Sequence, residues 1–344
     1  MRLGHFDALK PICPACRING DQQPLRIEEL LLEKDGHILQ ARILCAACFR
    51  EFPVIDGVPI LLPDVRGYIQ QNALALLTRQ DLGAPLRGLI GDCLGPTGPY
   101  EQSRLYLSSY ADEHWGDLEP DSTLSVGSVQ KVMGLGLELA GAISGPRLDL
   151  GCSLGRTTFL SAAQTDDLCL GVDLNFTMLA TAGHILRSGE VAYDRRRLGI
   201  VYDPVRFGVT LPQAERVDFW LADAATPPFA DSTFSVVSSL NLLDCLPSPA
   251  GHAEVLAQLL RQGGRAIVCT PYDWAPHATA IEGWLGGHSQ RGPDRGASEP
   301  VFHNLLAQAG FSTVALRDRV PWSIRLHARS SMSYEVELWV GERG

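Results

Sequence analysis

The stretch "RLDLGCSLGRTT", residues 147–158, decides the fold of this chain. Asp149 is followed by Gly151 and Gly155, but the middle glycine of an acid-x-Gly-x-Gly-x-Gly loop is replaced by Ser153. Glycines at the turn from a strand into a helix let the backbone approach a nucleotide closely. A dinucleotide oxidoreductase uses all three, so that the pyrophosphate reaches the helix N-terminus. Ser153 therefore favours a nucleotide without phosphates, such as S-adenosylmethionine, over NAD.

Short apolar strands alternate with helices from residue 146 onward, which predicts a doubly wound α/β fold with a mostly parallel sheet. The segments "PRLDLGC", "LCLGVDL", "VDFWLAD", "FSVVSSLNLL" and "GRAIVCTPY" supply five successive strands. The segments "AGFSTVALRDRV" and "SSMSYEVELWVGE" predict a closing antiparallel pair. The expected sheet therefore has seven strands.

Acidic residues follow the second and third of these strands. Asp173 stands 22 positions after Gly151, where a carboxylate can accept both hydroxyls of a ribose. Asp223 and Ala224 end the third strand. These acids could instead cap strand ends or lie on the surface, but their ordered spacing favours a nucleotide site.

Two Cys-x-x-Cys pairs mark the first sixty residues. The four cysteines are Cys13, Cys16, Cys45 and Cys48. A β-rich segment with Asp35-Gly36 as its turn separates the pairs and predicts a hairpin that brings them together. Four thiolates suit a tetrahedral zinc ion and leave no open position, so the metal is expected to be structural. The alternatives are four unrelated buried cysteines or a thiol redox pair.

The segment "FPVIDGVPILLP" follows the second cysteine pair. Together, residues 9–63 resemble the small zinc-ribbon proteins that activate tRNA and protein methyltransferases. In that family the ribbon docks on a methyltransferase through a hydrophobic face. The resemblance implies that this ribbon docks on the methyltransferase domain of its own chain.

The run from residue 146 to 344 resembles the class I S-adenosylmethionine-dependent methyltransferases, which have a Rossmann-like fold. This implies three units: a zinc-ribbon domain at 1–63, a helical linker and lid region at 64–145, and a methyltransferase domain at 146–344. In such enzymes an acid after the third strand meets the adenine amine, and the next backbone amide meets a ring nitrogen. The implied cofactor contacts are Asp149, Gly151, Cys152, Ser153, Gly155, Arg156, Thr157, Asp173, Leu174, Asp223, Ala224 and Asn241.

Four stretches narrow the resemblance: "DLGCSLGRTTF", "LNLLDCLPSP", "TPYDW" and "EGWLGG". They look like the domain fused to sulfoxide synthases in ovothiol biosynthesis, which methylates the imidazole ring of mercaptohistidine. The resemblance covers about residues 100–340. A zinc ribbon stands where that family carries its synthase domain and iron-binding histidines. We therefore expect a stand-alone partner of another synthase, or a paralogue with a shifted substrate.

Methyl transfer from a sulfonium is an in-line displacement in which positioning supplies most of the acceleration. An imidazole nitrogen already owns a lone pair, so it needs orientation and a proton acceptor. The expected catalytic residues are Asn241, Asp244 and Tyr272, which follow the fourth and fifth strands. The expected substrate-binding residues are Tyr193, Arg197, Tyr202, Trp274 and Trp284. Capping, packing or a solvated basic face are the alternatives for these side chains.

The helical region carries Tyr106, Tyr110, His114 and Trp115 at near-helical intervals. They could form either a packed helix face or a substrate lid. A formal net charge of -10 without a basic block argues against a protein that grips nucleic acid through its phosphates.

No apolar run approaches the roughly 18 residues of a membrane span, and the first residues lack a signal-peptide core. We therefore expect a cytoplasmic enzyme that acts on a small molecule. Methylation of tRNA, rRNA or protein is the alternative activity, although "NLLD" stands where many amine methylases carry Asn/Asp-Pro-Pro-Tyr. A non-catalytic scaffold that binds a partner is the remaining alternative.

Overall fold

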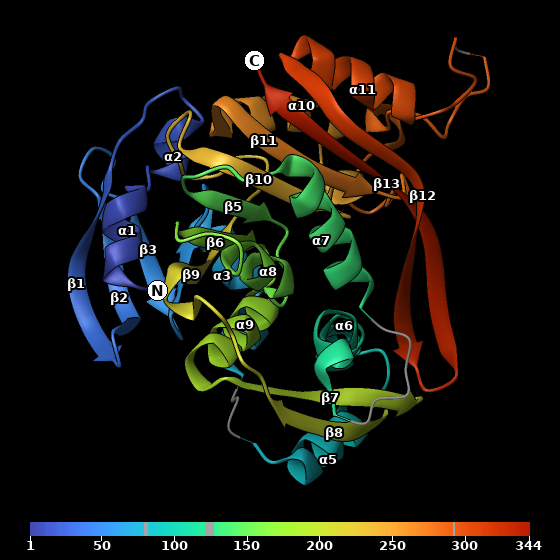
Figure 1. Cartoon of the computed structure of the whole chain (residues 1–344). Coiled ribbons are helices and arrows are strands. Elements are labelled where there is room, and N and C mark those ends of the chain that lie inside the picture. Colours follow the sequence, from blue (N-terminus) through green and yellow to red (C-terminus); the bar gives the residue numbers. More distant parts are fainter. Residues whose placement is uncertain (79–81, 121–126, 292) are drawn as a thin grey trace.

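The computed structural model describes residues 1–78, 82–120, 127–291 and 293–344 (Figure 1). Positions 79–81 and 121–126 of the expected linker, and position 292 of the expected C-terminal domain, lie outside the described residues.

Seven strands form the predicted sheet, in the order β9-β6-β5-β10-β11-β13-β12. Among these seven described strands, β13 runs in the direction opposite to the other six. The strands β5, β6, β9 and β10 are buried almost throughout, as expected where helices cover both faces of a sheet. The bounds are β5 Arg147–Leu150, β6 Cys169–Asp173, β9 Val217–Ala222, β10 Phe234–Leu240, β11 Leu260–Thr270, β12 Phe311–His327 and β13 Ser330–Arg343.

Helices lie on both faces of this sheet (Figure 1). One face carries α7 (Ser128–Ala140), α8 (Arg156–Ala162) and α9 (Phe176–Ser188), and the other carries α10 (Pro249–Leu259) and α11 (Glu299–Gln308). Short 3-10 turns complete the connections: η2 Ala214–Arg216, η3 Leu243–Cys245 and η4 Ile281–Gly283. The predicted Rossmann-like α/β fold is confirmed.

The N-terminal unit extends the same sheet. Its elements are α1 Leu3–Leu9, α2 Pro14–Arg17, β1 Leu25–Lys34, β2 His37–Cys45, β3 Glu51–Ile55 and β4 Val58–Leu61. The predicted hairpin joins β1 to β2, and its turn residues Asp35 and Gly36 have φ values of 51° and 75°, as a two-residue hairpin turn requires.

Strand β4 pairs in parallel with β9, Ile60 lying opposite Leu221. In the described residues the sheet therefore has eleven strands, and the expectation of seven is wrong. The reason is that β4 is fully buried and covers the edge of β9, which would otherwise present unpaired backbone groups. Phe6 of α1 also packs beside Trp220 of β9, with ring centroids 6.3 Å apart.

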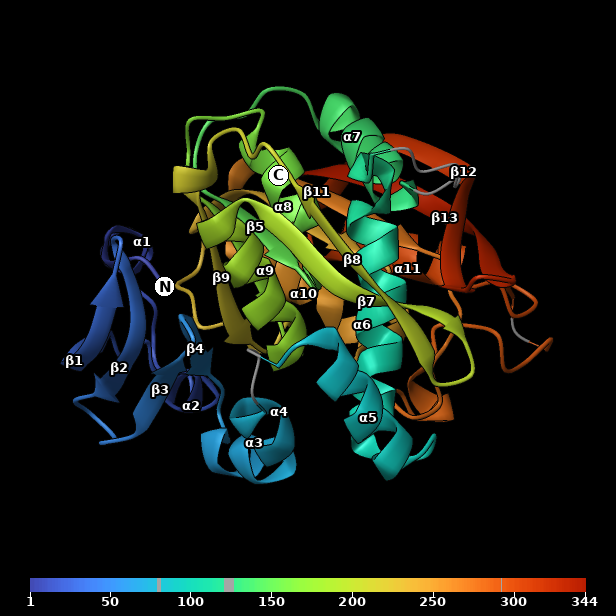
Figure 2. The ribbon, with the colours of Figure 1, turned by 90° about the horizontal axis from the view of Figure 1, so that it is seen from below.

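A helical layer and a separate hairpin stand beside the carboxyl ends of the strands (Figure 2). The layer contains α3 Val65–Gln71, α4 Ala73–Leu77, α5 Ala84–Leu94, α6 Pro99–Trp115 and η1 Gly116–Leu118. The insertion between the second and third predicted strands folds as the hairpin β7 Glu190–Leu198 and β8 Val201–Gly208. Helix α6 packs against both β7 and β12. Among the described helices, none combines the length and apolar character that crossing a membrane requires.

Candidate active site

The loop between β5 and α8 adopts an unusual backbone conformation. Gly151, Ser153 and Gly155 have φ values of 75°, 49° and 79°, all in the left-handed region. A Cβ on Gly155 would lie 2.4 Å from Cζ of Phe219, so no larger residue fits there without movement. Ser153 holds this conformation at a cost of about 1–2 kcal/mol, because its Cβ crowds the following carbonyl. The loop is therefore narrow and held close to the sheet.

Asp149 lies beneath this loop and is buried. Its carboxylate accepts hydrogen bonds from Thr157 Oγ1 (2.5 Å), Thr158 Oγ1 (2.8 Å) and Ser238 Oγ (2.7 Å). Burial raises the pKa of Asp149, and these hydroxyl donors oppose that rise. Asp149 thus ties the first turn of α8 to β5 and β10.

Asp173 ends β6 and faces the same loop. Its Oδ2 accepts the backbone amide of Ser153 at 2.9 Å, and its Oδ1 accepts the amide of Asn175 at 2.8 Å. Burial raises the pKa of Asp173. The neighbouring Leu174 is half exposed, and its carbonyl accepts the hydroxyl of Tyr68 at 2.7 Å. A carboxylate beside a loop of left-handed residues can accept hydrogen bonds from the hydroxyls of a ribose.

The remaining expected cofactor residues lie at the same edge of the sheet, where parallel strands end. Asp223 follows β9 and accepts the amide of Ala225 at 2.8 Å, with the buried Ala224 between them. Cys152 is buried, and its backbone amide donates to the carbonyl of Val172 at 3.0 Å.

The side chain of Arg156 points away from this edge of the sheet, toward α6 and the turn after it. It pairs with Asp117 at 3.2 Å and lies over the Trp115 ring, 5.3 Å from its centroid. Trp115 itself is buried against Phe159. Of the two alternatives for the aromatic residues of α6, the packed helix face applies to His114 and Trp115, which are buried. Tyr106, in contrast, is 42% exposed.

The loop after β10 places two candidate catalytic side chains next to the glycine loop. A Cβ on Gly151 would lie 3.1 Å from Leu242 Cδ1, so the two loops touch. Asn241 accepts from the Cys269 thiol at 3.5 Å. Asp244 is buried, and its Oδ1 receives no hydrogen bond from any described residue. Burial raises the pKa of Asp244 to about 6, and the charge of Asp273 adds to the rise.

Tyr272 is turned toward β13. Its hydroxyl donates to Glu337 Oε1 at 2.7 Å, and His303 Nε2 contacts the same oxygen at 2.9 Å. Burial and the Glu337 charge raise the pKa of the Tyr272 phenol well above its usual range. The hydroxyl of Tyr272 therefore already has a partner within the protein.

The two expected substrate tryptophans pack on each other. The rings of Trp274 and Trp284 are stacked, with centroids 6.5 Å apart and an interplanar angle of 17°. The indole of Trp274 donates to Ser298 Oγ at 3.3 Å, and that of Trp284 donates to the Thr279 carbonyl at 3.0 Å. Both indole donors are thus satisfied inside the fold.

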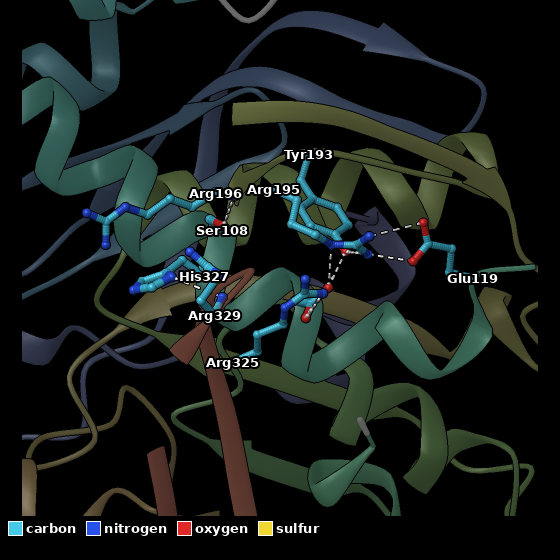
Figure 3. A network of polar contacts seen from close by, with 9 residues as sticks. Ser108, Glu119, Tyr193, Arg195, Arg196, Arg325, His327 and Arg329 are labelled. Carbon is cyan, nitrogen blue, oxygen red and sulfur yellow. Dashed lines mark hydrogen bonds and ion pairs between the residues drawn. The ribbon is translucent and has the colours of Figure 1, made fainter. Parts of the chain in front are cut away.

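The hairpin residues take part in a polar network with α6 and β12 (Figure 3). Tyr193 donates to Asp112 Oδ1 at 2.9 Å, and Arg195 Nε reaches the same oxygen at 2.7 Å. Arg195 also pairs with Glu119 at 2.6 Å, and Arg325 lies 3.7 Å from Asp112. The network fixes the β7–β8 hairpin and strand β12 to α6.

The other two expected substrate residues on the hairpin differ in exposure. Tyr202 donates to Glu101 Oε1 at 2.6 Å, under the guanidinium of Arg104. The Arg197 side chain is 61% exposed and pairs with Asp203, which matches the alternative of a solvated basic face. The structure therefore does not bring Arg197 together with the strand-end residues.

Sequence reasoning missed Glu113 on α6. Its side chain is buried, Trp322 donates a hydrogen bond to it, and burial raises its pKa to about 8. Tyr110 lies one turn earlier, and burial raises its phenol pKa, with the charges of Glu113, Cys245 and Asp173 adding to the effect. An acid inside the aromatic segment "SSYADEHW" was the available signal.

A groove of 1390 Å³ opens beside this edge. We call it the α6 groove: Asp173 and Cys245 lie at the strand ends, and Arg87, Arg104 and Asp194 line its far part. It passes between α9 and the layer formed by α5, α6 and the β7–β8 hairpin.

The four predicted metal ligands converge. Their sulfur atoms all lie within 4.8 Å of one another, Cys13 being 3.7 Å from Cys48 and Cys16 being 3.9 Å from Cys45. A tetrahedral zinc ion with Zn–S bonds of about 2.3 Å separates its sulfurs by about 3.8 Å. The donor set and spacing fit zinc, and four thiolates leave no position for a substrate.

Residues 148–268 match the protein family described as "Methyltransferase domain". The matched residues span β5 to β11 and include the glycine loop, Asp173, Asp223 and Asp244. The chain contains a class I S-adenosylmethionine-dependent methyltransferase domain. The matched residues include five of the seven strands of the predicted sheet, β5, β6, β9, β10 and β11, and the strands of the N-terminal unit continue that sheet.

Two curated relatives are similar to parts of this chain. Phosphoethanolamine N-methyltransferase 1 of Triticum aestivum is 25% identical over 53% of this chain and 31% of the relative. The chain thus spans about a third of that protein's length. O-methyltransferase cnsE of Penicillium expansum is 24% identical over 65% of this chain and 74% of the relative. A solved geranyl diphosphate methyltransferase in complex with S-adenosylmethionine is 15% identical, with a TM-score of 0.45, over 72% of this chain and 92% of that one.

Proposed function

We propose that this protein transfers a methyl group from S-adenosylmethionine to a ring nitrogen of a small imidazole, a thiohistidine of the ovothiol type. The resemblance of "DLGCSLGRTTF", "LNLLDCLPSP", "TPYDW" and "EGWLGG" to that enzyme family supports the choice of acceptor. The two curated relatives differ from each other in acceptor atom, one being an N- and the other an O-methyltransferase by name. The proposal therefore rests on residues of this chain.

The observation that carries the proposal is the free carboxylate oxygen of Asp244. It is buried in η3, the turn that follows β10, two residues after Leu242, which contacts the glycine loop, and no described residue donates to it. A buried acceptor without a partner is costly, and a bound N–H group removes that cost. A neutral imidazole offers such an N–H on one ring nitrogen and a lone pair on the other.

Bound S-adenosylmethionine would supply an electrophilic methyl group, from which the acceptor nitrogen would displace S-adenosylhomocysteine in line as the carbon–sulfur bond breaks. Asp244 would hold the opposite N–H of the ring and so direct the lone pair. As the nitrogen–methyl bond forms, the ring becomes cationic, and Asp244 takes the proton from the opposite nitrogen. With a pKa of about 6, Asp244 is largely ionised at neutral pH and able to accept it.

Mass spectrometry of products tests this proposal. The protein is incubated with S-adenosylmethionine and either mercaptohistidine or histidine, with phosphoethanolamine as a third acceptor. We expect one added methyl group on mercaptohistidine, and at least a tenfold lower rate in Asp244→Asn, which still accepts a hydrogen bond but cannot take the proton. Methylation of phosphoethanolamine alone, or undiminished turnover in Asp244→Asn, would overturn it.

A further inference from the structure

Arg104 stands out among the residues that line the α6 groove. Its side chain is 9% exposed, yet its Nε and Nη1 donate to no described residue. Buried guanidinium donors without acceptors are uncommon, because each lost hydrogen bond to water must be replaced. Arg104 is one of the residues that line this groove.

The two acids near Arg104 do not satisfy it. Glu101 Oε2 and Asp194 Oδ2 each lie 3.7 Å from its nitrogens, beyond hydrogen-bond length. Both acids have closer partners. Asp194 accepts hydrogen bonds from Arg87 at 2.6 and 2.8 Å, and Glu101 Oε1 accepts one from the hydroxyl of Tyr202. Among the described residues of this cluster, Arg87, Asp194 and Tyr202 have hydrogen-bond partners, whereas Arg104 Nε and Nη1 and Glu101 Oε2 have none.

The guanidinium of Arg104 is held in a fixed position. Its Cζ lies 4.0 Å from the centroid of the Tyr202 ring and 5.7 Å from that of Tyr100. On the side of α5, a Cβ on Gly91 would lie 2.4 Å from Arg104 Nη1. The absence of a side chain at Gly91 thus leaves room for this guanidinium, and the aromatic ring supports its plane.

We propose that Arg104 binds the carboxylate of the amino acid acceptor in the α6 groove. This rests on the proposed function, and it names the group that distinguishes an amino acid from a simple imidazole. A planar carboxylate matches the paired donors of a guanidinium, and such charge-assisted bonds are strong when buried. Arg104 and Tyr110 are six residues apart on α6, about 9 Å along its axis. Tyr110 lies near Asp173 and Cys245, whose charges act on its phenol, and these two residues line the groove together with Arg104. A ligand in the α6 groove can therefore extend from Arg104 toward the strand ends.

Calorimetric titration with histidine and histamine tests the carboxylate subsite. The two probes share the imidazole, the ethyl chain and the ammonium, and only histidine has the carboxylate. In protein saturated with S-adenosylhomocysteine we expect histidine to bind at least tenfold more tightly than histamine. Arg104→Gln should abolish this difference by weakening only histidine. Arg206→Gln is the control, because Arg206 lines the same groove but is 72% exposed and paired with Glu190.

A second variant guards against misfolding of Arg104→Gln, which thermal melting would reveal. Gly91→Ala keeps the charge of Arg104 but pushes its guanidinium aside, and we expect it to reduce the histidine preference severalfold. Equal affinity for both probes in the unaltered protein, absent binding of both, or equal losses in Arg104→Gln and Arg206→Gln would overturn the subsite. If the histidine preference depends on Arg104 while mercaptohistidine is not methylated, the proposed reaction fails and the subsite stands. If mercaptohistidine is methylated but histidine shows no such preference over histamine, the subsite fails and the proposed reaction stands.

Discussion

The backbone amide of Ser153 donates a hydrogen bond to Asp173 Oδ2 across 2.9 Å. This bond joins the loop after β5 to the acid at the end of β6, so the two strand ends hold each other in place. Because Ser153 uses its amide rather than its side chain, the serine can replace glycine without losing the contact. The consequence of that replacement is backbone strain, because Ser153 keeps a left-handed φ of 49° that glycine adopts more readily.

Asp173→Ala should weaken S-adenosylhomocysteine binding roughly tenfold to a hundredfold, since hydrogen bonds to a charged acceptor contribute about 1.5–3 kcal/mol. The variant also leaves the Ser153 amide without its acceptor. Asp166→Ala, which changes an exposed acid, should bind as the unaltered protein does. Calorimetric titration measures both, and an unchanged affinity in Asp173→Ala would remove the ribose role.

Gly155→Ala should destabilise the fold more than Gly141→Ala. Both glycines have φ values in the left-handed region, 79° and 74°, so each alanine costs about 1–2 kcal/mol in backbone strain. Only Gly155 also faces a close neighbour, Phe219, which adds about 1–3 kcal/mol for overpacking. Urea unfolding, with closely spaced urea concentrations around the midpoint, measures the difference in the free energy of unfolding between the two variants. Equal losses in the two variants would mean that the loop moves freely away from Phe219.

Local sequence patterns were sufficient for the strands of the methyltransferase domain and for the turn at Asp35-Gly36, because period and turn chemistry are encoded within a few residues. The pairing of β4 with β9 has no such signal. Ile60 and Leu221 are 161 positions apart, and an apolar strand of four residues fits many partners. The eleven-stranded sheet therefore could not be derived from the strand pattern.

Side-chain direction is the second property that the sequence did not reveal. "TPYDW" reads the same whether Tyr272 faces a substrate or Glu337, and the acid that takes its hydroxyl lies 65 positions away. Glu113 was overlooked for a related reason. Its burial depends on Trp322, 209 positions along the chain, whereas its neighbours in sequence are polar.

Native protein should contain one zinc ion per chain, and Cys16→Ser should lose it. Because β4 of the N-terminal unit pairs with β9, we expect the loss to lower the melting temperature of the whole chain by several degrees in a single transition. Cys93→Ser is the matched control, since Cys93 is exposed and outside the cluster. Metal analysis and calorimetry check this, and metal-free native protein of unchanged stability would contradict it.

Methyl transfer should rise with pH through about 6, as Asp244 loses its proton. The sign follows from the role, because only the ionised carboxylate accepts the imidazole proton. Asp273→Asn removes the neighbouring negative charge and should move the midpoint of the profile downward. The profile of kcat against pH between 5 and 8 measures both. If the midpoint of the profile is unchanged in Asp273→Asn, the titration belongs to a group other than Asp244.

Glu113→Gln should change the pH dependence of stability. Burial raises the pKa of Glu113 from 4.5 to about 8, so the unfolded chain releases this proton near pH 4.5 whereas the folded chain keeps it until near pH 8. Between these values the unfolded state binds fewer protons, and the free energy of unfolding falls as pH rises, by up to about 1.4 kcal/mol per unit. Glutamine carries no charge and still accepts from the Trp322 indole.

Urea unfolding of the unaltered protein and of Glu113→Gln at pH 5, 6, 7 and 8 isolates this contribution from those of other acids. We expect the variant to gain stability relative to the unaltered protein at each step upward in pH. Glu335→Gln, at a side chain 62% exposed, should show no such trend. A constant difference between Glu113→Gln and the unaltered protein across the four pH values would mean that Glu113 is already ionised in the fold, with water or a cation reaching it beside Trp322.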